Sequence, residues 1–496
     1  MRERLKSAPA DVMCDYIFMP AIQEENDRSF YNMAALNMSH VLMLKKQNII
    51  DKTSANALLK ALYEMTQLGP SCLSIAPECE DYYFNIERYI IQKVGKEIGG
   101  KMHTARSRND LGSTLIRMNV RDRLYDLIGM AITLRGSIIK MAERYPDQVV
   151  TGYTHMQPAQ PITLAYYLAA VSQALGRDIS RLQDAYCRMN ECPLGSCAFA
   201  GTSFPIDRHF TAAGLGFNGP MRNSMDAVAS RDYLLEICAA FTILGSTLNR
   251  FATDLYFWST DEFSYIEVDD SLAVCSSIMP QKKNPISLEH VKAKTSHLLG
   301  AFVSITMALK GIPYCHNRDG GAESSHLFWD ACKQMEAILA VMNETVVTTK
   351  IKCDIMTKRA NSNYSTVTEL ADELVKSEHM PFRTAHEIVA NVVLKCLDLG
   401  LTSLDITPEI LDASAIEISG KEFHWSDEKL RQVLDAENSV HHRTSFGGPS
   451  RQECDSMLAV QRSETQELRS WLQAQERQTT DARETLFAQV RESALD

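Results

Sequence analysis

One long stretch without helix breakers constrains the fold more than any other feature. Between Pro220 and Pro280 the sequence has no proline and a single glycine, Gly245. Large apolar residues recur inside it in alternating steps of three and four: Leu234, Ile237, Phe241, Leu244, Leu248, Phe251 and Leu255. This spacing predicts one long helix with a continuous apolar stripe.

Four further apolar residues lie away from that stripe. They are Leu235, Ile243, Tyr256 and Phe257. A surface helix needs only one buried face, so the additional residues predict a helix covered on several sides. Such a helix indicates a bundle that includes other subunits.

The rest of the chain has the same helical character. Residues 111–145, 165–189 and 287–311 also have the spacing of long helices, and alternating strand patterns are few. With 496 residues the chain is too long for one simple core. We predict an all-α protein with an N-terminal helical domain (1–106), a central long-helix bundle (107–355) and a C-terminal helical domain (356–496). The polar, glycine-free last 40 residues predict an exposed, partly frayed terminal helix.

Composition excludes several classes of protein. The net charge is −11 and no long basic run occurs, which argues against a nucleic-acid partner. The N-terminus lacks the apolar core of a secretory signal, and no uncharged apolar run reaches the roughly 20 residues of a membrane span. The 13 cysteines are scattered, without the spacing of a metal site, so we expect reduced thiols in a cytoplasmic protein.

Polar segments interrupt the helical pattern at four places: 101–110, 151–161, 223–232 and 275–285. We expect each at or near a helix end, where free backbone N–H groups can gather around an anion. Taken singly, each has an ordinary explanation, such as a helix cap or a loop histidine. Together they supply the cations, hydroxyls and amides that would hold a dicarboxylate.

These segments resemble the aspartase/fumarase superfamily, and within it the argininosuccinate lyase branch. "CSSIMPQKKNP" is similar to the superfamily signature, approximately GSSxMPxKxNP, with Cys275 in place of the glycine. "HTARSRND", "GYTHMQPAQPITL", "NSMDAVASRD", "CPLGSCAFAGT" and "ENSVHHRTSFGG" resemble segments of that branch. The resemblance runs in continuous order over residues 15–455. It implies a homotetramer whose central helices form one large bundle, with each active site drawn from three subunits.

The resemblance implies an elimination that releases fumarate. Ser276 matches the family's catalytic base, and a serine hydroxyl must act as an alkoxide to do this. Lys282 and backbone N–H groups could stabilise that charge, and Asn284 could donate to a substrate carboxylate. The two prolines of the segment restrict its conformations and so reduce the entropy lost on closure over substrate.

Other matched residues would hold the substrate. Ser107, Arg108 and Asn109 match the residues that bind the fumarate part. Thr154 matches a carboxylate contact, and His155 matches a catalytic histidine, a residue type suited to proton transfer near neutral pH. Whether His155 protonates the leaving nitrogen or orients another group stays open.

Two more matches complete the implied site. Arg231 matches a site arginine of the branch, and Asp81 matches an acidic residue that contacts the amine portion. Nothing in the sequence indicates a metal or an organic cofactor, and the chemistry needs neither.

The amine half of the site departs from the family pattern. The branch recognises arginine with a segment close to YNRDLQEDKEPLF, and this chain has "HNRDGGAESSHLF". His316 stands where the family has tyrosine, Gly321 where it has glutamine and Ser324 where it has lysine, while Tyr83 replaces a histidine. Each lost polar partner typically weakens binding by about 1–3 kcal/mol.

We therefore predict a carbon–nitrogen lyase acting on an N-substituted aspartate other than argininosuccinate, with ethylenediaminedisuccinate lyases as a relevant comparison. Three alternatives stay open. The first is argininosuccinate lyase itself, with other residues filling the arginine pocket. The second is a catalytically silent structural protein of the lens-crystallin type, and the third is a lyase for another carbon–heteroatom bond.

Overall fold

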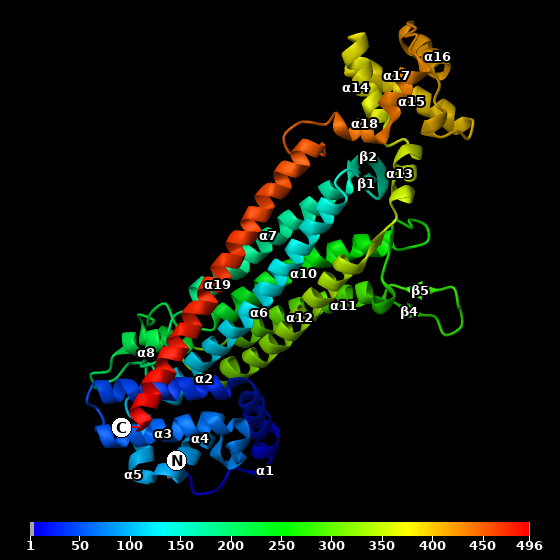
Figure 1. Cartoon of the computed structure of the whole chain (residues 1–496). Helices are drawn as coiled ribbons and strands as arrows, with labels where there is room; N and C mark the ends of the chain where they lie inside the picture. The colour runs from blue at the N-terminus through cyan, green and yellow to red at the C-terminus, as the bar shows by residue number, and fades with distance from the viewer. Residues whose placement is uncertain (1–3, 496) are drawn as a thin grey trace.

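The computed structural model describes residues 4–495, and they form an elongated, almost entirely helical molecule (Figure 1). Five long helices build its centre: α6 (Arg108–Arg144), α7 (Leu164–Met189), α10 (Asp232–Trp258), α11 (Ile286–Leu309) and α12 (Ser324–Thr348). The predicted all-α class is confirmed, because the strands are short and pair only in two-stranded hairpins or ribbons. These strands are β1 (Val149–Thr154), β2 (Gln157–Thr163), β3 (Ile266–Glu267), β4 (Val274–Cys275), β5 (Lys283–Asn284) and β6 (Lys350–Ile351).

Smaller groups of helices cover the two ends of the bundle. At one end lie α1 (Asp11–Met13), α2 (Met19–Lys46), α3 (Lys52–Leu68), α4 (Tyr82–Val94) and α5 (Lys96–Gly99), with α8 (Arg208–Gly214) and α9 (Ser224–Ala229) close by. At the other end lie α13 (Cys353–Ser362), α14 (Val367–Glu378), α15 (Phe382–Asp398), α16 (Pro408–Ser419), α17 (Asp427–Leu434) and α18 (Ala436–His441). Separate hydrophobic clusters fill the bundle and each end group. The domain limits at residues 106 and 355 stay a prediction.

Helix α10 contains the predicted apolar stripe. All seven stripe residues are buried, none more than 4% exposed, where α10 packs against α7, α11 and α12. The helix is long and apolar enough to cross a membrane, but the core helix of a bundle meets the same criteria, and α10 is one. Ile243 and Phe257 remain 42% and 40% exposed. Within one chain, α10 is therefore covered on only part of the surface that was predicted to be buried.

The C-terminal residues form the predicted terminal helix, but it is not exposed over its whole surface as we expected. Helix α19 (Arg451–Leu495) is a single helix of 45 residues that runs from the C-terminal helices along the bundle to the N-terminal helices (Figure 1). Leu458 and Leu472 join the bundle core, and Leu486 and Val490 join the N-terminal core. A long helix packs with one narrow apolar stripe, and this stripe is easily missed in a segment of polar composition.

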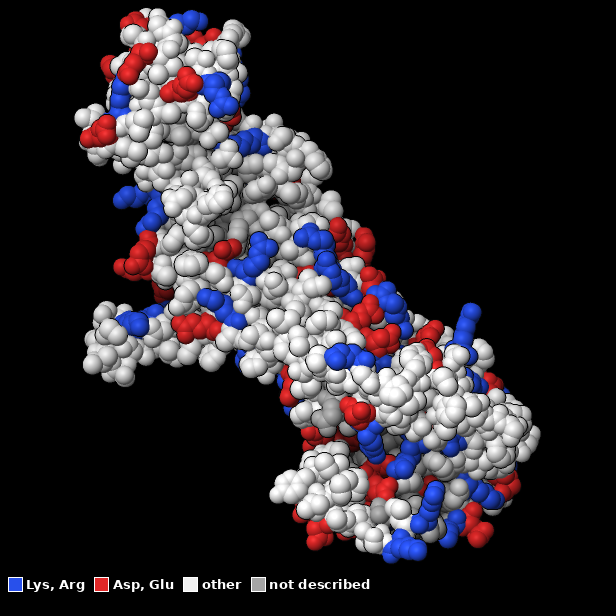
Figure 2. Space-filling view, turned by 180° about the vertical axis from the view of Figure 1, so that it is seen from behind, with Lys and Arg blue, Asp and Glu red and all other residues white. Residues whose placement is uncertain are grey.

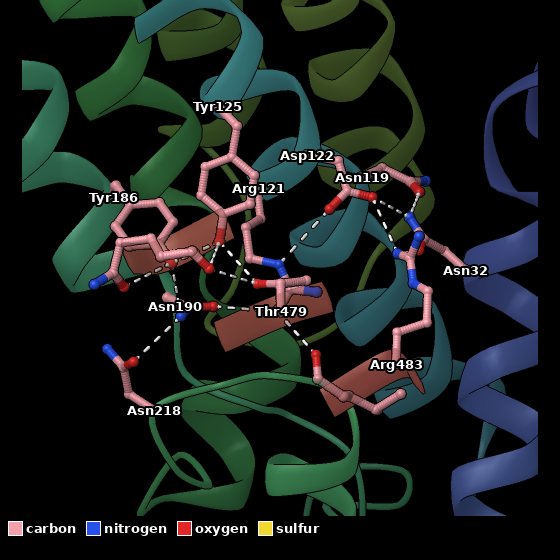
Figure 3. Close-up of polar contacts among 12 residues, drawn as sticks. Asn32, Asn119, Arg121, Asp122, Tyr125, Tyr186, Asn190, Asn218, Thr479 and Arg483 are labelled. Atoms are coloured by element: carbon pink, nitrogen blue, oxygen red, sulfur yellow. Dashed lines mark hydrogen bonds and ion pairs between the residues drawn. The ribbon is translucent and has the colours of Figure 1, made fainter. Parts of the chain in front are cut away.

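A buried polar network fixes α19 to α6 and α7 (Figure 3). The Tyr125 hydroxyl lies 2.9 Å from both the Tyr186 hydroxyl and Thr479 Oγ1. Tyr186 donates to Gln475 Oε1 at 3.2 Å and accepts from Asn190 Nδ2 at 3.1 Å. Because both rings are buried, each hydroxyl depends on these partners for its hydrogen bonds.

We expect Tyr186→Phe to lower the free energy of unfolding by about 1–3 kcal/mol, because it leaves buried partners in this network unsatisfied. Urea denaturation followed by circular dichroism measures the change. Tyr16→Phe, at an exposed position, is the control. Equal stability of the two variants would show that the network does not hold α19.

Candidate active site

Helix α6 begins with a capped turn that presents three of the predicted substrate-binding residues. Ser107 is the N-cap: its Oγ accepts the N–H of Asn109 at 3.3 Å, and its own N–H donates to Asp110 Oδ1 at 2.9 Å. The other Asp110 oxygen accepts the N–H groups of Gly195 and Cys197 at 2.8 and 2.9 Å. The helix-cap interpretation of this segment is therefore confirmed, and the cap also fixes the "CPLGSCAFAGT" segment beside it.

Arg108 connects this turn to α4. Its Nη1 lies 2.8 Å from Asp81 Oδ2 and 3.6 Å from Glu80, and its guanidinium lies over the Phe84 ring. Asp81 is the N-cap of α4 and accepts the Phe84 N–H at 2.9 Å. The predicted amine-contacting carboxylate and a predicted fumarate-binding arginine are thus direct neighbours.

Arg231 and His316 lie at the same end of the bundle. Arg231 precedes α10, is buried, and donates from Nη2 to Ser113 Oγ at 3.3 Å. Its Nε has no hydrogen-bond partner among residues 4–495. Burial lowers the pKa of His316, and the positive charges of Arg231, Arg318 and Arg108 lower it further. His316 is therefore a neutral donor and acceptor in a cationic environment.

Glu25 of α2 belongs to this cluster and was missed in the sequence. Burial raises its pKa to about 7, the negative charge of Asp81 adds to the shift, and Arg318 and Arg28 oppose it. Perturbed carboxyls of this kind are frequent at functional sites. Nothing in the sequence distinguishes Glu25 from its exposed neighbour Glu24, because only the tertiary fold brings it to Asp81.

Thr154 and His155 lie at the tip of the β1–β2 hairpin, in an exposed position. The segment lies near a helix end, as predicted, because α7 begins at Leu164, but its two antiparallel strands were not predicted. His155 and Met156 both have positive φ, 52° and 59°, the conformation of a two-residue hairpin turn. The turn therefore directs the histidine away from the bundle's own core.

The Ser276 segment forms the loop between β4 and β5, outside any helix, as predicted. Ser276 Oγ accepts two backbone N–H bonds, from Ile278 at 3.4 Å and Met279 at 3.1 Å. Two converging N–H groups favour negative charge on that oxygen. Lys282 is exposed, whereas Lys283 fixes the loop base by pairing with Glu267 at 3.1 Å.

Asn284 lies in β5 and pairs across the ribbon with Val274. Pro285 follows it as the N-cap of α11. The loop is therefore held at its base by strand pairing and at its end by a helix start, while Ile278 at its tip is 83% exposed.

One chain brings only part of the predicted site together. Asp81, Ser107, Arg108, Asn109, Arg231 and His316 gather at the N-terminal end of the bundle. Helix α6 has 37 residues and separates Ser107 from the β1–β2 hairpin by about 55 Å at 1.5 Å per residue. Helix α10, with 27 residues, separates Arg231 from the Ser276 loop by about 40 Å. The N-terminal cluster, the β1–β2 hairpin and the Ser276 loop therefore lie at three different positions along the length of the molecule (Figure 1).

Among the side chains that the structure describes, no group of three or more His, Cys, Asp or Glu is placed to hold a metal ion. The cavity between α6 and α19, lined by Asp122, Tyr125 and Arg483 among others, contains none of the predicted site residues.

Comparison with known proteins gives consistent matches along the chain. Residues 18–300 match the "Lyase" family model, and residues 364–441 match "Argininosuccinate lyase C-terminal". The chain is 43% identical to argininosuccinate lyase 1 of Shouchella clausii, over 90% of this chain and 89% of that protein. It is 36% identical to the argininosuccinate lyase of Methanosarcina acetivorans, over 94% and 93%. A solved EDDS lyase variant with bound fumarate is 31% identical, with a TM-score of 0.87 over 99% of this chain and 97% of that one.

We expect Glu25→Gln to stabilise the protein in a pH-dependent way. The unfolded carboxyl ionises near its ordinary pKa of 4.5, whereas the folded one keeps its proton to about pH 7, so the wild type loses stability as pH rises through this window. Glutamine cannot ionise, so the advantage of the variant should grow from about pH 4.5 to 7 and then level off.

Urea midpoints measured across that range test this expectation, with Glu64→Gln on the exposed side of α3 as the control. A Glu25→Gln effect that is constant with pH would mean that the folded carboxyl titrates normally.

Proposed function

This chain belongs to the argininosuccinate lyase-like branch of the aspartase/fumarase superfamily and is a fumarate-releasing carbon–nitrogen lyase, and we propose that its substrate is argininosuccinate. The observation that carries the proposal is the 43% identity, over nine-tenths of both chains, to a protein named argininosuccinate lyase. The cluster around Arg108 and Asp81 supports it, because it places a cation for a carboxylate next to an anion for an amine. The substrate predicted from the sequence, an N-substituted aspartate with a different amine, therefore becomes the second candidate.

A second candidate is another N-substituted aspartate, and the segment after His316 favours it. A side chain at Gly321 would meet open space, so the altered position leaves room that the family's glutamine would occupy. Ser324 is fully buried and donates to the Gly320 carbonyl within its own turn. Neither residue supplies the polar contact of the family pattern, and EDDS lyase shares the fold over the whole chain.

We assign the base to Ser276. As an alkoxide, held by the N–H groups of Ile278 and Met279, it takes the proton from the carbon next to the substrate carboxylate. The electron pair of that C–H bond forms the C=C bond of fumarate, and the C–N bond breaks with its pair on nitrogen. Lys282 stabilises the charge of the alkoxide, and Asn284 donates a hydrogen bond to the carboxylate on which negative charge develops.

The remaining groups hold the substrate. Ser107, Arg108 and Asn109 bind the fumarate part, with Arg231 as a further cation, and Asp81 faces the amine together with the neutral His316. Thr154 contacts a carboxylate, and His155 either delivers the proton to the leaving nitrogen or orients the group that does.

The long separations within one chain support a site that is completed by several chains. We propose a homotetramer in which the anion-binding end of one chain meets the hairpin of a second and the Ser276 loop of a third. The exposed apolar residues Ile243 and Phe257 of α10, with Leu299, Val303 and Met307 of α11, are the surface that the other chains would cover.

Fumarate release, followed by its ultraviolet absorbance, tests the proposed substrate. We expect rapid release from argininosuccinate, and a loss of at least about 1,000-fold in kcat for Ser276→Ala, because no other group takes the proton. The neighbouring Ser277→Ala is the matched control and should keep most of the activity.

A panel of N-substituted aspartates, including the EDDS type, is assayed beside argininosuccinate. Release from one of these but not from argininosuccinate would replace the first candidate by the second. Release from none of them would contradict both.

Mixing of inactive variants tests the shared site. Ser276→Ala and Arg108→Ala chains are each expected to be inactive, but random mixed tetramers should regain up to roughly a quarter of wild-type activity, because some sites then receive both residues intact from different chains. The two variants are unfolded and refolded together, and each variant refolded alone is the control. No recovery in tetramers shown to be mixed would mean that one chain supplies both residues.

A further inference from the structure

The hairpin that carries His155 is held mainly by the C-terminal helices. An isolated two-stranded hairpin is marginally stable in water, so β1 and β2 depend on what they pack against. Strand β1 packs against α13, and β2 packs against α18 (Figure 1). Val149 at the start of β1 forms a small buried cluster with Ala360 of α13 and Ala436 of α18.

Two side chains of the C-terminal helical region donate hydrogen bonds to one cross-strand pair of the hairpin. Thr151 and Pro161 face each other across the ladder. Asn363, the C-cap of α13, donates from Nδ2 to Thr151 Oγ1 at 2.8 Å. Arg443, just after α18, donates from Nη1 to the Pro161 carbonyl at 3.0 Å. Both strands are thus fixed at the same level.

The Thr151–Pro161 pair lies next to an irregularity in the pairing of β1 with β2. The pairing shifts between Thr151 and Tyr153, and Gly152 lies so close to the second strand that an added Cβ would approach the Gln160 carbonyl to 2.6 Å. Only the pairs Tyr153–Pro158 and Thr154–Gln157 lie beyond it before the turn at His155. The direction of the tip therefore depends on the contacts at Thr151 and Pro161, together with Tyr153, whose hydroxyl lies 3.1 Å from that of Tyr265.

Arg443 also forms an ion pair with a residue of α14. Its side chain is mostly buried, and Glu369 of α14, only 5% exposed, lies 3.8 Å from its Nη2. The chain then turns tightly, with the Gly448 N–H donating to the Ser445 carbonyl at 2.8 Å and the Gly447 N–H donating to Glu453 of α19 at 2.9 Å. The Arg443 guanidinium therefore lies between Glu369 of α14 and the Pro161 carbonyl of the hairpin.

We propose that Arg443, together with Asn363, is a positioning residue for His155, so that the C-terminal helices orient a group of the active site that they do not touch. This inference rests on the proposed function, in which His155 acts at the substrate. It gives the segment "ENSVHHRTSFGG" a role, since Arg443 is its central residue. A displacement of about 1 Å at a reacting group can lower the rate by about 100-fold, so a loosened hairpin is expected to affect turnover.

The test compares Arg443→Ala with Arg383→Ala, an exposed arginine of α15 in the same part of the chain. With the fumarate-release assay we expect Arg443→Ala to lower kcat at least about tenfold with little change in KM, and Arg383→Ala to resemble the wild type. In a His155→Asn background, Arg443→Ala should cause no further loss, because the group it positions is already absent.

Hydrogen exchange of the hairpin amides gives a readout that needs no substrate. Arg443→Ala and the near-isosteric Thr151→Val, which removes the acceptor of Asn363, should both raise exchange in residues 151–161 and leave α6 and α10 unchanged. Thr151→Val keeps the proposal testable if Arg443→Ala fails to fold.

Exchange and turnover that stay at wild-type values in both variants would overturn the proposal, and so would losses that multiply with that of His155→Asn. A wild type that releases no fumarate from any substrate, with hairpin exchange still raised in the two variants, would support the role of Arg443 and Asn363 in holding the hairpin. The same result would contradict the proposed function.

Discussion

The fixed rise of the α-helix determines how this protein can build a catalytic site. Helices α6 and α10 are continuous and each packs against several other helices, which holds their two ends apart. The residues before α6 and the hairpin after it stay about 55 Å apart at 1.5 Å per residue. The buried stripe of α10 makes this spacing rigid. The packing of the bundle therefore keeps these groups apart within one chain.

At the N-terminal end of the bundle, charge is concentrated where burial strengthens its effect. Burial, followed by the charges of Arg231, Arg318 and Arg108, lowers the pKa of His316, and burial followed by the charge of Asp81 raises that of Glu25. The N-termini of α6 and α10, after Ser107 and Arg231, add the positive ends of two helix dipoles to this region. The region therefore combines fixed guanidinium charges with one carboxyl, Glu25, whose charge changes near pH 7.

The fold could be predicted where local pattern and tertiary packing agree. The stripe of α10 was readable because each of its residues repeats at the helical period and is buried. The hairpin at His155 was not, because its turn uses two non-glycine residues with positive φ instead of the usual turn residues. The packing of α19 was missed because its buried residues are spaced widely among polar ones. Family resemblance proposed Ser276, Arg108 and Arg231 as site residues, which stay a prediction, whereas Glu25 depends on its proximity to Asp81, which no local pattern encodes.

Helix α19 contacts the cores at two places far apart along its own length, near Leu472 and near Val490. A single inserted residue between them would turn one half by about 100° and shift it by about 1.5 Å relative to the other. One of the two contact faces would then point to solvent. The number of residues in this helix is therefore under tighter constraint than their identity, and natural variation in this region should change the outward side chains while keeping the length between the two contacts.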